Sequence, residues 1–380
     1  MFYRHLFQWL GDQMTNLIAI DARSSGTSTG RYVDKLIEYI AKIDPDYDFN
    51  IIAYSDRVGF MKKIAPKYTV YETKVPLLGF KEQTDLLREI NEIDADLVHF
   101  AMIQQPVLYR GKVVTTMHDL TMAKPEFRNP RTNVVVFYIK MVVYKWINKI
   151  GAKKSAFIIT GTEYIKKEVM GFTKQPDKKF VVTYESADKI KEKADPYKKL
   201  VGKKFLMYIG RPWPHKNLNR LIDAFQILQD KHPDLYLALA GVKNDNYVDI
   251  EKRVNSQGIK NIIFTDFVTE GQLRWLYENC AVYVFPSLSE GFGLPGLEAM
   301  VHGAPVVSSN ATCLPEVYGD AAMYFNPRDT DNMAGVINTV LSDEKLREEM
   351  IKKGFAQAAK YSWQRMAEQT LAVYDRALKS

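Results

Sequence analysis

"SEGFGLPGLEAM" (residues 289–300) follows closely on the apolar run "VYVFPS" (282–287), and together they predict a strand, a loop and a helix. The run is short and rich in Val, Tyr and Phe, which is typical of a buried strand. Pro295 suits the first turn of a helix, because an amide proton there would have no helical partner. The loop therefore carries Glu290, and Glu298 lies near the start of the helix.

The loop and the helix start carry groups that suit one kind of ligand. Gly291 and Gly293 leave backbone amides open to a phosphate at the helix N-terminus. The carboxylates at 290 and 298 would repel phosphate and suit hydroxyl groups instead. A nucleotide sugar, with phosphates in its middle and hydroxyls at both ends, satisfies both. In the structural alternative, Glu298 only complements the helix dipole and the glycines only turn the chain.

The chain has 380 residues, more than one core usually holds, so we expect two domains. Its composition, 46% hydrophobic and 26% charged, is that of a globular protein. No apolar run reaches the ~20 residues that cross a bilayer, and residues 1–13 are expected to be an added extension or an interfacial helix. Cys280 and Cys313 show neither disulfide nor zinc-site spacing, which fits a reducing cytoplasm.

Positive charge gathers in one part of the chain. The net charge is +7, and residues 101–186 hold fifteen Lys and Arg against six Asp and Glu. Such a region suits nucleic acid, an anionic membrane or a phosphorylated substrate, and no nucleic-acid module pattern favours the first. Within it, "YIKMVVYKWINKIGAKK" (138–154) interleaves lysines with apolar side chains. We expect this helix either to lie on an anionic membrane surface or to pack on the first domain's sheet.

Strand-like and helix-like segments alternate along the whole chain, which predicts parallel sheets with crossover helices. A polar segment, residues 185–204, interrupts the alternation and is the expected linker between two doubly wound domains with a ligand cleft between them. The expected strands are residues 16–22, 49–55, 97–100, 112–117, 157–160 and 180–184 before the linker, and 205–210, 235–241, 262–267, 282–287 and 305–309 after it.

Ligands in such sheets bind beyond the carboxyl ends of the strands, where three further loops carry notable residues. These are Gly26 and Gly30 in the loop 23–32, His118 and Asp119 after 112–117, and Arg211, His215 and Lys216 after 205–210. Arg211 and Lys216 are candidates to neutralise a diphosphate without a metal; the alternative is two solvated surface charges. His118 either positions a sugar hydroxyl or is a buried histidine bonded to backbone.

Two other motifs give little support to a function. Gly26 and Gly30 lack the G-x-G-x-x-G spacing of a dinucleotide-binding dehydrogenase. Asp94 and Asp96 form a D-x-D sequence but precede a strand, so we interpret them as loop residues and expect no bound metal.

Taken together, these segments resemble the retaining glycosyltransferases of family 4, whose GT-B fold has two Rossmann-like doubly wound α/β domains facing a central cleft. "SEGFGLPGLEAM" looks like the E-x7-E motif, "GRPWPHKNLNRLIDAF" like the phosphate loop, "MHDL" like the His-Asp loop and "GRYVDKL" like the acceptor-side loop. "HGAPVVSSNATCLPEV" resembles the segment after the second Glu, and "YSWQRMAEQTLAVY" the C-terminal helix that crosses back to the first domain.

The resemblance implies an acceptor-side domain over residues 1–190, a donor domain over 191–362 and a crossing helix over 363–380. Two positions depart from the family pattern, since Ser186 and Asp266 stand where many members have Gly.

The resemblance also assigns roles to single residues. It implies that Arg211 and Lys216 hold the donor diphosphate and that His118 lies near the reacting sugar. Glu290 would bind hydroxyls of the transferred sugar and complete this catalytic set, and Glu298 would bind those of the ribose. The other donor contacts would come from Gly30, Gly291, Phe292, Gly293 and Leu294.

We therefore expect a metal-independent retaining enzyme that moves a sugar from a nucleoside diphosphate sugar to a glycan or lipid-linked hydroxyl, without a cofactor. The motif style favours GDP-mannose as donor over a UDP-sugar. A GT-B nucleotide-sugar epimerase and a sugar-nucleotide-binding protein without turnover stay open as alternatives. The expected location is the cytoplasm, with peripheral attachment to the inner face of the membrane as the hypothesis for residues 138–154.

Overall fold

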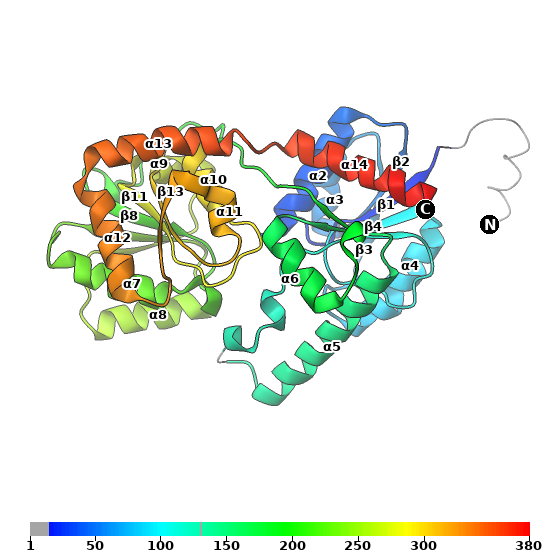
Figure 1. Ribbon diagram of the computed structural model, residues 1–380, viewed down its shortest axis with the longest axis horizontal. Coiled ribbons are helices and arrows are strands. Elements are labelled where there is room, and N and C mark those ends of the chain that lie inside the picture. The colour runs from blue at the N-terminus through cyan, green and yellow to red at the C-terminus, as the bar shows by residue number, and fades with distance from the viewer. Residues whose placement is uncertain (1–14, 130) are drawn as a thin grey trace, which may run out of the picture.

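The strands form two sheets that lie side by side (Figure 1). The computed structural model describes residues 15–129 and 131–380, and within these ranges every strand pairing is parallel. The expectation for residues 1–13 lies outside the described residues. Parallel strands need crossover connections, and helices supply them in both parts of the chain.

The first sheet has the strand order β3-β2-β1-β4-β5-β6-β7. Its strands are β1 (Leu17–Asp21), β2 (Asp48–Tyr54), β3 (Thr69–Thr73), β4 (Leu97–Phe100), β5 (Val113–Thr116), β6 (Phe157–Thr160) and β7 (Phe180–Val182). The helices that accompany them are α2 (Gly30–Ile43), α3 (Ser55–Ile64), α4 (Asp85–Ile93), α5 (Val134–Lys154) and α6 (Glu163–Thr173).

The second sheet has the order β10-β9-β8-β11-β12-β13. Its strands are β8 (Phe205–Ile209), β9 (Tyr236–Ala240), β10 (Ile262–Asp266), β11 (Val282–Phe285), β12 (Val306–Ser309) and β13 (Ala322–Phe325). Its helices are α7 (Leu218–Gln229), α8 (Asp245–Ser256), α9 (Glu270–Asn279), α10 (Leu294–Val301), α11 (Leu314–Tyr318), α12 (Thr330–Ser342) and α13 (Glu344–Ala358). In both sheets the strand order reverses beside the first strand, which is the arrangement of a doubly wound fold.

The chain passes between the two sheets twice. The first passage, after β7, is the polar segment 185–204. Its one regular element is a short 3₁₀ turn, Lys198–Leu200. The second leads from α13 to α14 (Trp363–Lys379), which lies beside α2 on the first sheet (Figure 1). Trp363, Met366 and Tyr374 of α14 are buried in the core of that first part.

All eleven strands that the sequence predicts are present, with ends that differ by at most two residues. Two strands are not predicted, and both lie at a sheet edge. β3 is mostly exposed and therefore lacks an apolar signal, and β13 has only four residues. Edge position alone does not explain the two misses, because the edge strands β7 and β10 are predicted; β3 lacks the buried apolar side chains that give a strand signal.

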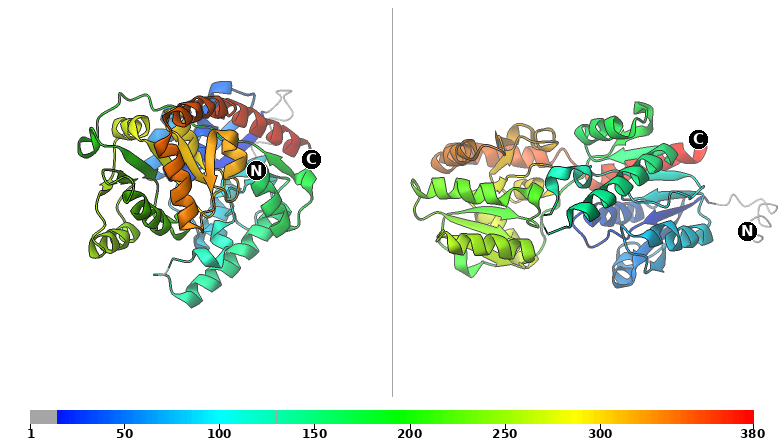
Figure 2. Two further views of the ribbon diagram at one scale, coloured as in Figure 1. Left: turned by 60° about the vertical axis from the view of Figure 1, so that its left-hand side comes forward. Right: turned by 90° about the horizontal axis from the view of Figure 1, so that it is seen from below.

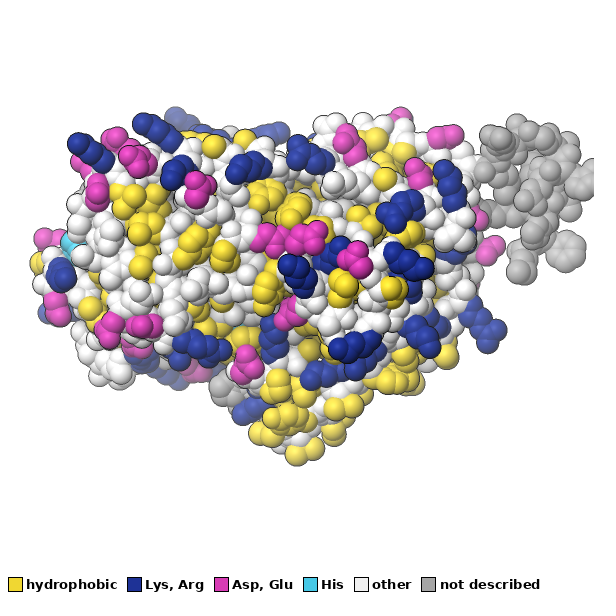
Figure 3. All heavy atoms as spheres, in the orientation of Figure 1, with side chains coloured by type: hydrophobic (Ala, Val, Ile, Leu, Met, Phe, Trp, Pro, Cys, Tyr) yellow, Lys and Arg dark blue, Asp and Glu magenta, His cyan; other side chains and the backbone are white. Residues whose placement is uncertain are grey.

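Helix α5 is only partly packed on the first domain. Its buried residues are Met141, Asn148, Gly151 and Ala152, which lie mainly in its second half. Its first half projects away from the body in both Figure 1 and Figure 2. There an apolar end of α5 is exposed to solvent, and Figure 3 shows it as a hydrophobic protrusion. It consists of Val134, Val135, Val136, Tyr138, Ile139, Val142, Val143 and Trp146.

Candidate functional site

A cleft of about 340 Å³ lies between the two sheets and is lined by loops from both. The loops follow β1, β5 and β7 in the first sheet, and β8 and β11 in the second. β8 and β11 are the neighbouring strands at which the order of the second sheet reverses, the usual position of a ligand in such a fold.

Nine of the ten residues that the sequence analysis assigns to the site line this cleft. They are His118, Arg211, Lys216, Glu290, Gly291, Phe292, Gly293, Leu294 and Glu298. Gly30 is buried beside the cleft, and its amide donates hydrogen bonds to the carbonyl and hydroxyl oxygens of Thr27. Its neighbours Ser28, Thr29 and Arg31 line the cleft instead.

The loop between β11 and α10 takes its form from two glycines. Gly293 has φ +94°, and a Cβ there would lie 2.6 Å from both Leu314 and Tyr318. A Cβ on Gly291 would lie 2.2 Å from the carbonyl oxygen of His118 in the opposite domain. The loop can therefore approach the first domain closely only because position 291 has no side chain.

Lys216 and Glu290 form an ion pair inside the cleft. The lysine Nζ lies 2.6 Å from Glu290 Oε1, and both side chains are mostly buried. Lys216 ends a 3₁₀ turn, Pro214–Lys216, whose His215 carbonyl accepts a hydrogen bond of 2.7 Å from the Leu288 amide. This hydrogen bond joins the loop after β8 to the loop after β11, and so it fixes Lys216 and Glu290 relative to each other.

Glu298 is bound on both of its carboxylate oxygens. Oε2 accepts a hydrogen bond of 3.3 Å from the Tyr277 hydroxyl, and Oε1 pairs with Arg31 of α2 across the cleft. The Arg31 side chain is half exposed, whereas Glu298 is mostly buried. A ligand hydroxyl at Glu298 would therefore have to replace or share the contact with Arg31.

His118 is bonded to backbone, which is one of the two alternatives raised by its sequence position, and its side chain also lines the cleft. Its Nε2 lies 3.0 Å from the Ala101 carbonyl oxygen, and its Nδ1 lies 3.6 Å from Glu185 Oε1. Burial would lower the pKa of His118, but the Glu185 carboxylate and the Ala101 carbonyl outweigh it and raise that pKa.

His215 lines the same cleft, but its pKa is shifted in the opposite direction to that of His118. Burial, together with the charge of Lys216, lowers the pKa of His215 to about 4. Its ring meets Phe127 edge to face at a centroid distance of 5.8 Å. His215 is therefore neutral near pH 7.

Arg31 and Glu185 are cleft residues that the sequence analysis did not identify as such. Arg31 stands within "GRYVDKL", next to the predicted Gly30, so the motif marked its place but not its side chain. Glu185 begins the polar segment that we interpreted as a linker. A charged residue in a charged linker gives no signal of burial, and only the fold brings its carboxylate to His118.

Further contacts join the two domains beside the cleft. The Thr121 and Ser289 hydroxyls lie 3.0 Å apart. Glu316 of α11 accepts hydrogen bonds of 2.7 and 2.8 Å from the amides of Glu163 and Tyr164, which begin α6. A carboxylate at a helix N-terminus is favoured by the helix dipole, so this contact between α11 and α6 stabilises the packing of the two domains against each other.

Asp94 and Asp96 lie at the amino ends of β1 and β4, central strands of the first sheet, and not at the carboxyl ends where the cleft loops begin. Asp94 follows the last residue of α4 with φ +51°, and Asp96 Oδ2 accepts a hydrogen bond of 2.7 Å from the Leu17 amide at the start of β1. Within residues 15–129 and 131–380 no group of three His, Cys, Asp or Glu side chains is placed to hold a metal ion.

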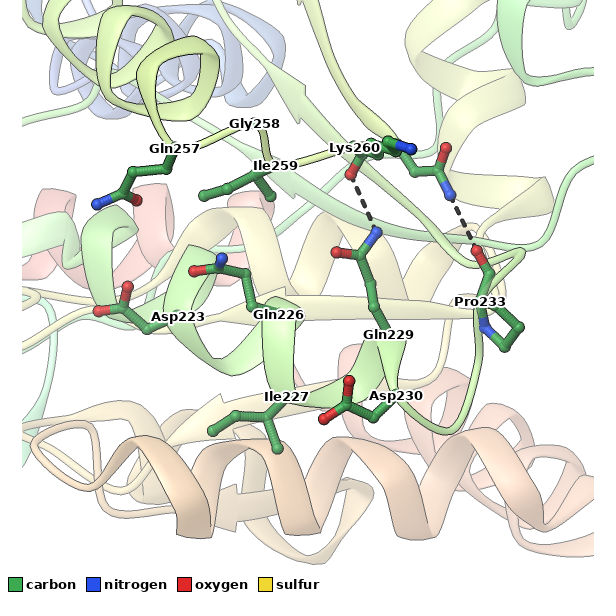
Figure 4. A pocket seen from close by; sticks show the side chains of 11 residues that line it. Asp223, Gln226, Ile227, Gln229, Asp230, Pro233, Gln257, Gly258, Ile259 and Lys260 are labelled. Carbon is green, nitrogen blue, oxygen red and sulfur yellow. Dashed lines mark hydrogen bonds between the residues drawn. The ribbon is translucent and has the colours of Figure 1, made fainter.

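A larger hollow, of about 750 Å³, lies elsewhere on the second domain and shares no residue with the cleft. It is lined by one side of α7 and by residues 257–261 (Figure 4). Gln229 donates to the Lys260 carbonyl, and Asn261 to the Pro233 carbonyl. None of its lining residues belongs to the site that the sequence predicts, so its size alone does not make it a candidate.

The sequence of this chain is similar to a family model and to several known proteins. Residues 189–357 match the family model described as glycosyl transferases group 1. The chain is 30% identical to O-antigen chain mannosyltransferase B of Escherichia coli over 276 residues, which is 69% of this chain and 70% of that protein. It is 32% identical to serotype-specific mannosyltransferase WbdA of Escherichia coli over 283 residues, 71% of this chain but only about a third (34%) of that relative's length.

Solved structures show the same fold at low sequence identity. Sucrose-phosphate synthase of Thermosynechococcus elongatus superposes with a TM-score of 0.77 at 16% identity, covering 95% of this chain and 98% of that one. WaaG, described as a glycosyltransferase involved in lipopolysaccharide biosynthesis, superposes with a TM-score of 0.71 at 13% identity. The match covers 94% of this chain and 99% of that one.

Proposed function

Because the chain belongs to the group 1 glycosyltransferases and has their GT-B fold, we propose that it transfers a sugar from a nucleoside diphosphate sugar to a hydroxyl of a glycan or lipid-linked acceptor. The observation that carries the proposal is the cleft itself. Two loop cations, the start of a helix and two carboxylates converge there, and they complement a ligand with a diphosphate between two hydroxyl-bearing parts.

The donor is a substrate in this proposal, and no separate cofactor takes part. We favour GDP-mannose over a UDP-sugar, because the relatives that match over most of this chain are named mannosyltransferases. The sugar and the base are therefore proposed from likeness and not from a contact in the cleft.

Negative charge grows on the diphosphate as the bond to the sugar breaks. Arg211 and Lys216 would bind that charge, and the amides at the start of α10 would add to it. Since these groups are fixed before the reaction, they stabilise the transition state without reorganising. Lys216 would then exchange part of its contact with Glu290 for a phosphate oxygen, which leaves the carboxylate to accept from a sugar hydroxyl.

The sugar passes through a state with oxocarbenium character, as in other glycosyl chemistry. Retention, which we propose from the family, would follow if the acceptor attacks the same face that the diphosphate leaves. Donor and acceptor would then meet between Glu290 of the second domain and His118 of the first.

We propose further that the enzyme works at the inner surface of a membrane and meets its acceptor there. The apolar end of α5 supports this, because eight large apolar side chains are exposed on one helix. Lys140 lies among them and Lys145 and Lys149 follow, as expected for a helix seated at an anionic surface. None of the helices in the described part of the chain is both long and apolar enough to cross a bilayer.

Incubation with a radiolabelled donor tests the proposed activity. Release or transfer of the labelled sugar is the expected result. An isomerised nucleotide sugar would identify an epimerase instead, and an unchanged donor that nevertheless binds would identify a binding protein. A thermal-shift series with GDP, UDP and ADP selects the base, because a nucleotide that binds only the folded state raises the unfolding midpoint.

A further inference from the structure

The side chain of His118 is almost enclosed, with 13% of it exposed, so each ring nitrogen must find its partner within the protein or in the cleft. Nε2 lies 3.0 Å from the carbonyl oxygen of Ala101. A carbonyl oxygen only accepts hydrogen bonds, so Nε2 carries a proton.

The other nitrogen faces a negative charge. Nδ1 lies 3.6 Å from Glu185 Oε1, and the Glu185 side chain is 8% exposed. If the ring were neutral, with its proton on Nε2, the lone pair of Nδ1 would point at this carboxylate. A second proton on Nδ1 turns that repulsion into an ion pair.

The other titratable groups around His118 do not compete for the same role. Asp119 adds negative charge but is committed to the Thr121 amide at 2.7 Å. Tyr32 of α2 meets the His118 ring edge to face, and its hydroxyl lies 3.0 Å from that of Thr116. His99 of β4 stays neutral, because burial and the charge of His118 lower its pKa to about 3. Its two nitrogens lie 2.6 and 2.8 Å from the hydroxyls of Tyr374 and Thr116.

We propose that Glu185 is a positioning residue, which holds His118 as an imidazolium whose Nε2–H is hydrogen-bonded to the Ala101 carbonyl and whose Nδ1–H faces the Glu185 carboxylate as an ion pair. The ring then cannot turn without breaking a charged contact. The carbonyl oxygen of His118 is the atom against which Gly291 packs, in the loop between β11 and α10, which we call the donor loop. Glu185 and His118 therefore fix, from the first domain and the linker, the surface on which the donor loop closes.

The protonation state can be measured directly. With ring-¹⁵N histidine labelling, six histidines give signals, and a His118→Gln variant identifies the one of interest. We expect the titration of His118 to lie above that of an ordinary histidine, with both of its ring nitrogens carrying protons on the acid side of that titration. If His118 titrates at or below the ordinary pKa of ~6.5, the proposal is wrong, and no further variant is needed for that conclusion.

Substitution separates the role of Glu185 from a merely structural one. Because the carboxylate raises the pKa of His118, the protonated form is present at low pH and is lost as the pH rises through that pKa. Glu185→Gln should therefore move the titration of His118 to lower pH, and Glu185→Asp should move it back in part. Glu192→Gln, an exposed change in the same linker, is the matched control and should leave it in place.

The kinetic part of the inference rests on the proposed transferase function. In Glu185→Gln the alkaline limb of kcat should shift to lower pH along with the His118 titration, and Glu185→Asp should move both back in part. If the titration shifts and the limb does not, the pair exists without serving catalysis. If no transfer occurs in the wild type, the proposed function fails, while the spectra still decide the state of His118.

Discussion

Lys216 and Glu290 are assigned by resemblance to different parts of a donor, to the diphosphate and to the sugar, and in the structure their side chains bind each other at 2.6 Å. The pair keeps both charges in place, because an unpaired charge in a mostly buried site is costly. A donor that brings its own negative charge to Lys216 and its own hydroxyl to Glu290 can replace the contact without leaving either group alone.

We expect Lys216→Ala and Arg211→Ala each to lower turnover roughly 10²- to 10³-fold, the usual effect of losing one preorganised stabiliser of developing charge. Steady-state kinetics with a saturating donor measure it. Lys352→Ala, an exposed change on α13, is the control and should have no effect. Near-normal turnover in both site variants would contradict the assignment of these residues to the diphosphate.

Gly291 gives a sharper test, because the contact is purely steric. A methyl group at 291 would lie 2.2 Å from the His118 carbonyl oxygen and would force the donor loop away from the first domain. We expect Gly291→Ala to lower turnover by about 10²-fold, since displacement of about 1 Å at a reacting centre has that effect. Gly59→Ala, where a methyl group meets nothing within 4 Å, is the matched control. Equal turnover in the two variants would show that the close approach is not needed.

Among elements, the strand-loop-helix units could be predicted well from the sequence, since strands buried on both faces have continuous apolar runs that alternate with helices. The conformation of the loops that follow the strands could not be predicted. Asp266, where the resemblance expects Gly, ends β10 with φ +58°, a conformation that Asp tolerates better than most residues. Its Oδ1 also accepts a hydrogen bond of 2.9 Å from the Lys243 amide, so the departure from Gly keeps the turn.

In the proposed reaction, the loop after β8 and the start of α10 would together bring positive charge to the leaving diphosphate, and this leads to a prediction about metal removal. We expect transfer to continue in excess EDTA at a rate close to that in EDTA already saturated with Mg²⁺, because Arg211, Lys216 and backbone amides take the place of a cation. Complete loss in EDTA, restored by Mg²⁺ or Mn²⁺, would contradict it.

Helix α5 predicts binding to vesicles. Ile139, Val142 and Trp146 recur at helical spacing on its exposed face, and each basic residue near an anionic surface adds about 1 kcal/mol. Co-sedimentation should rise with anionic lipid and fall with added salt. It should weaken when Lys145, Lys149 and Lys153 become Glu.

The apolar part of the same prediction has its own variant. Changing Ile139, Val142 and Trp146 to Ser should also weaken co-sedimentation, whereas changing Val201 and Val242, which are exposed elsewhere, should not. Equal binding to neutral and anionic vesicles would show that the basic residues of α5 do not contribute to membrane binding. No binding to either would leave the apolar end of α5 as a surface for a protein partner.

At the scale of the whole molecule, the core of the first domain is completed by a helix that follows the second domain in sequence. Trp363 of α14 follows the second domain in sequence but is buried in the first. We expect Trp363→Ala to lower the free energy of unfolding by about 3–5 kcal/mol. Hydrogen exchange should rise in α2 and β4, beside α14, and stay unchanged in α12.

Phe355→Ala on α13 is the control for that measurement, because Phe355 is half exposed and belongs to the second domain. Protection lost mainly in β8 to β13 would show that α14 supports its neighbour in sequence and not its neighbour in space.

The position of α14 also has a consequence for biosynthesis. The ribosome makes residues 17–182, and with them the whole first sheet, long before it makes residues 363–379. During that interval the face of β4, β5 and β6 that α14 covers is without its helix, while the second sheet and its own helices are already complete. Because domains fold as units once their chain is available, the domain that is begun first is finished last, and the nascent chain carries an uncovered apolar face until then.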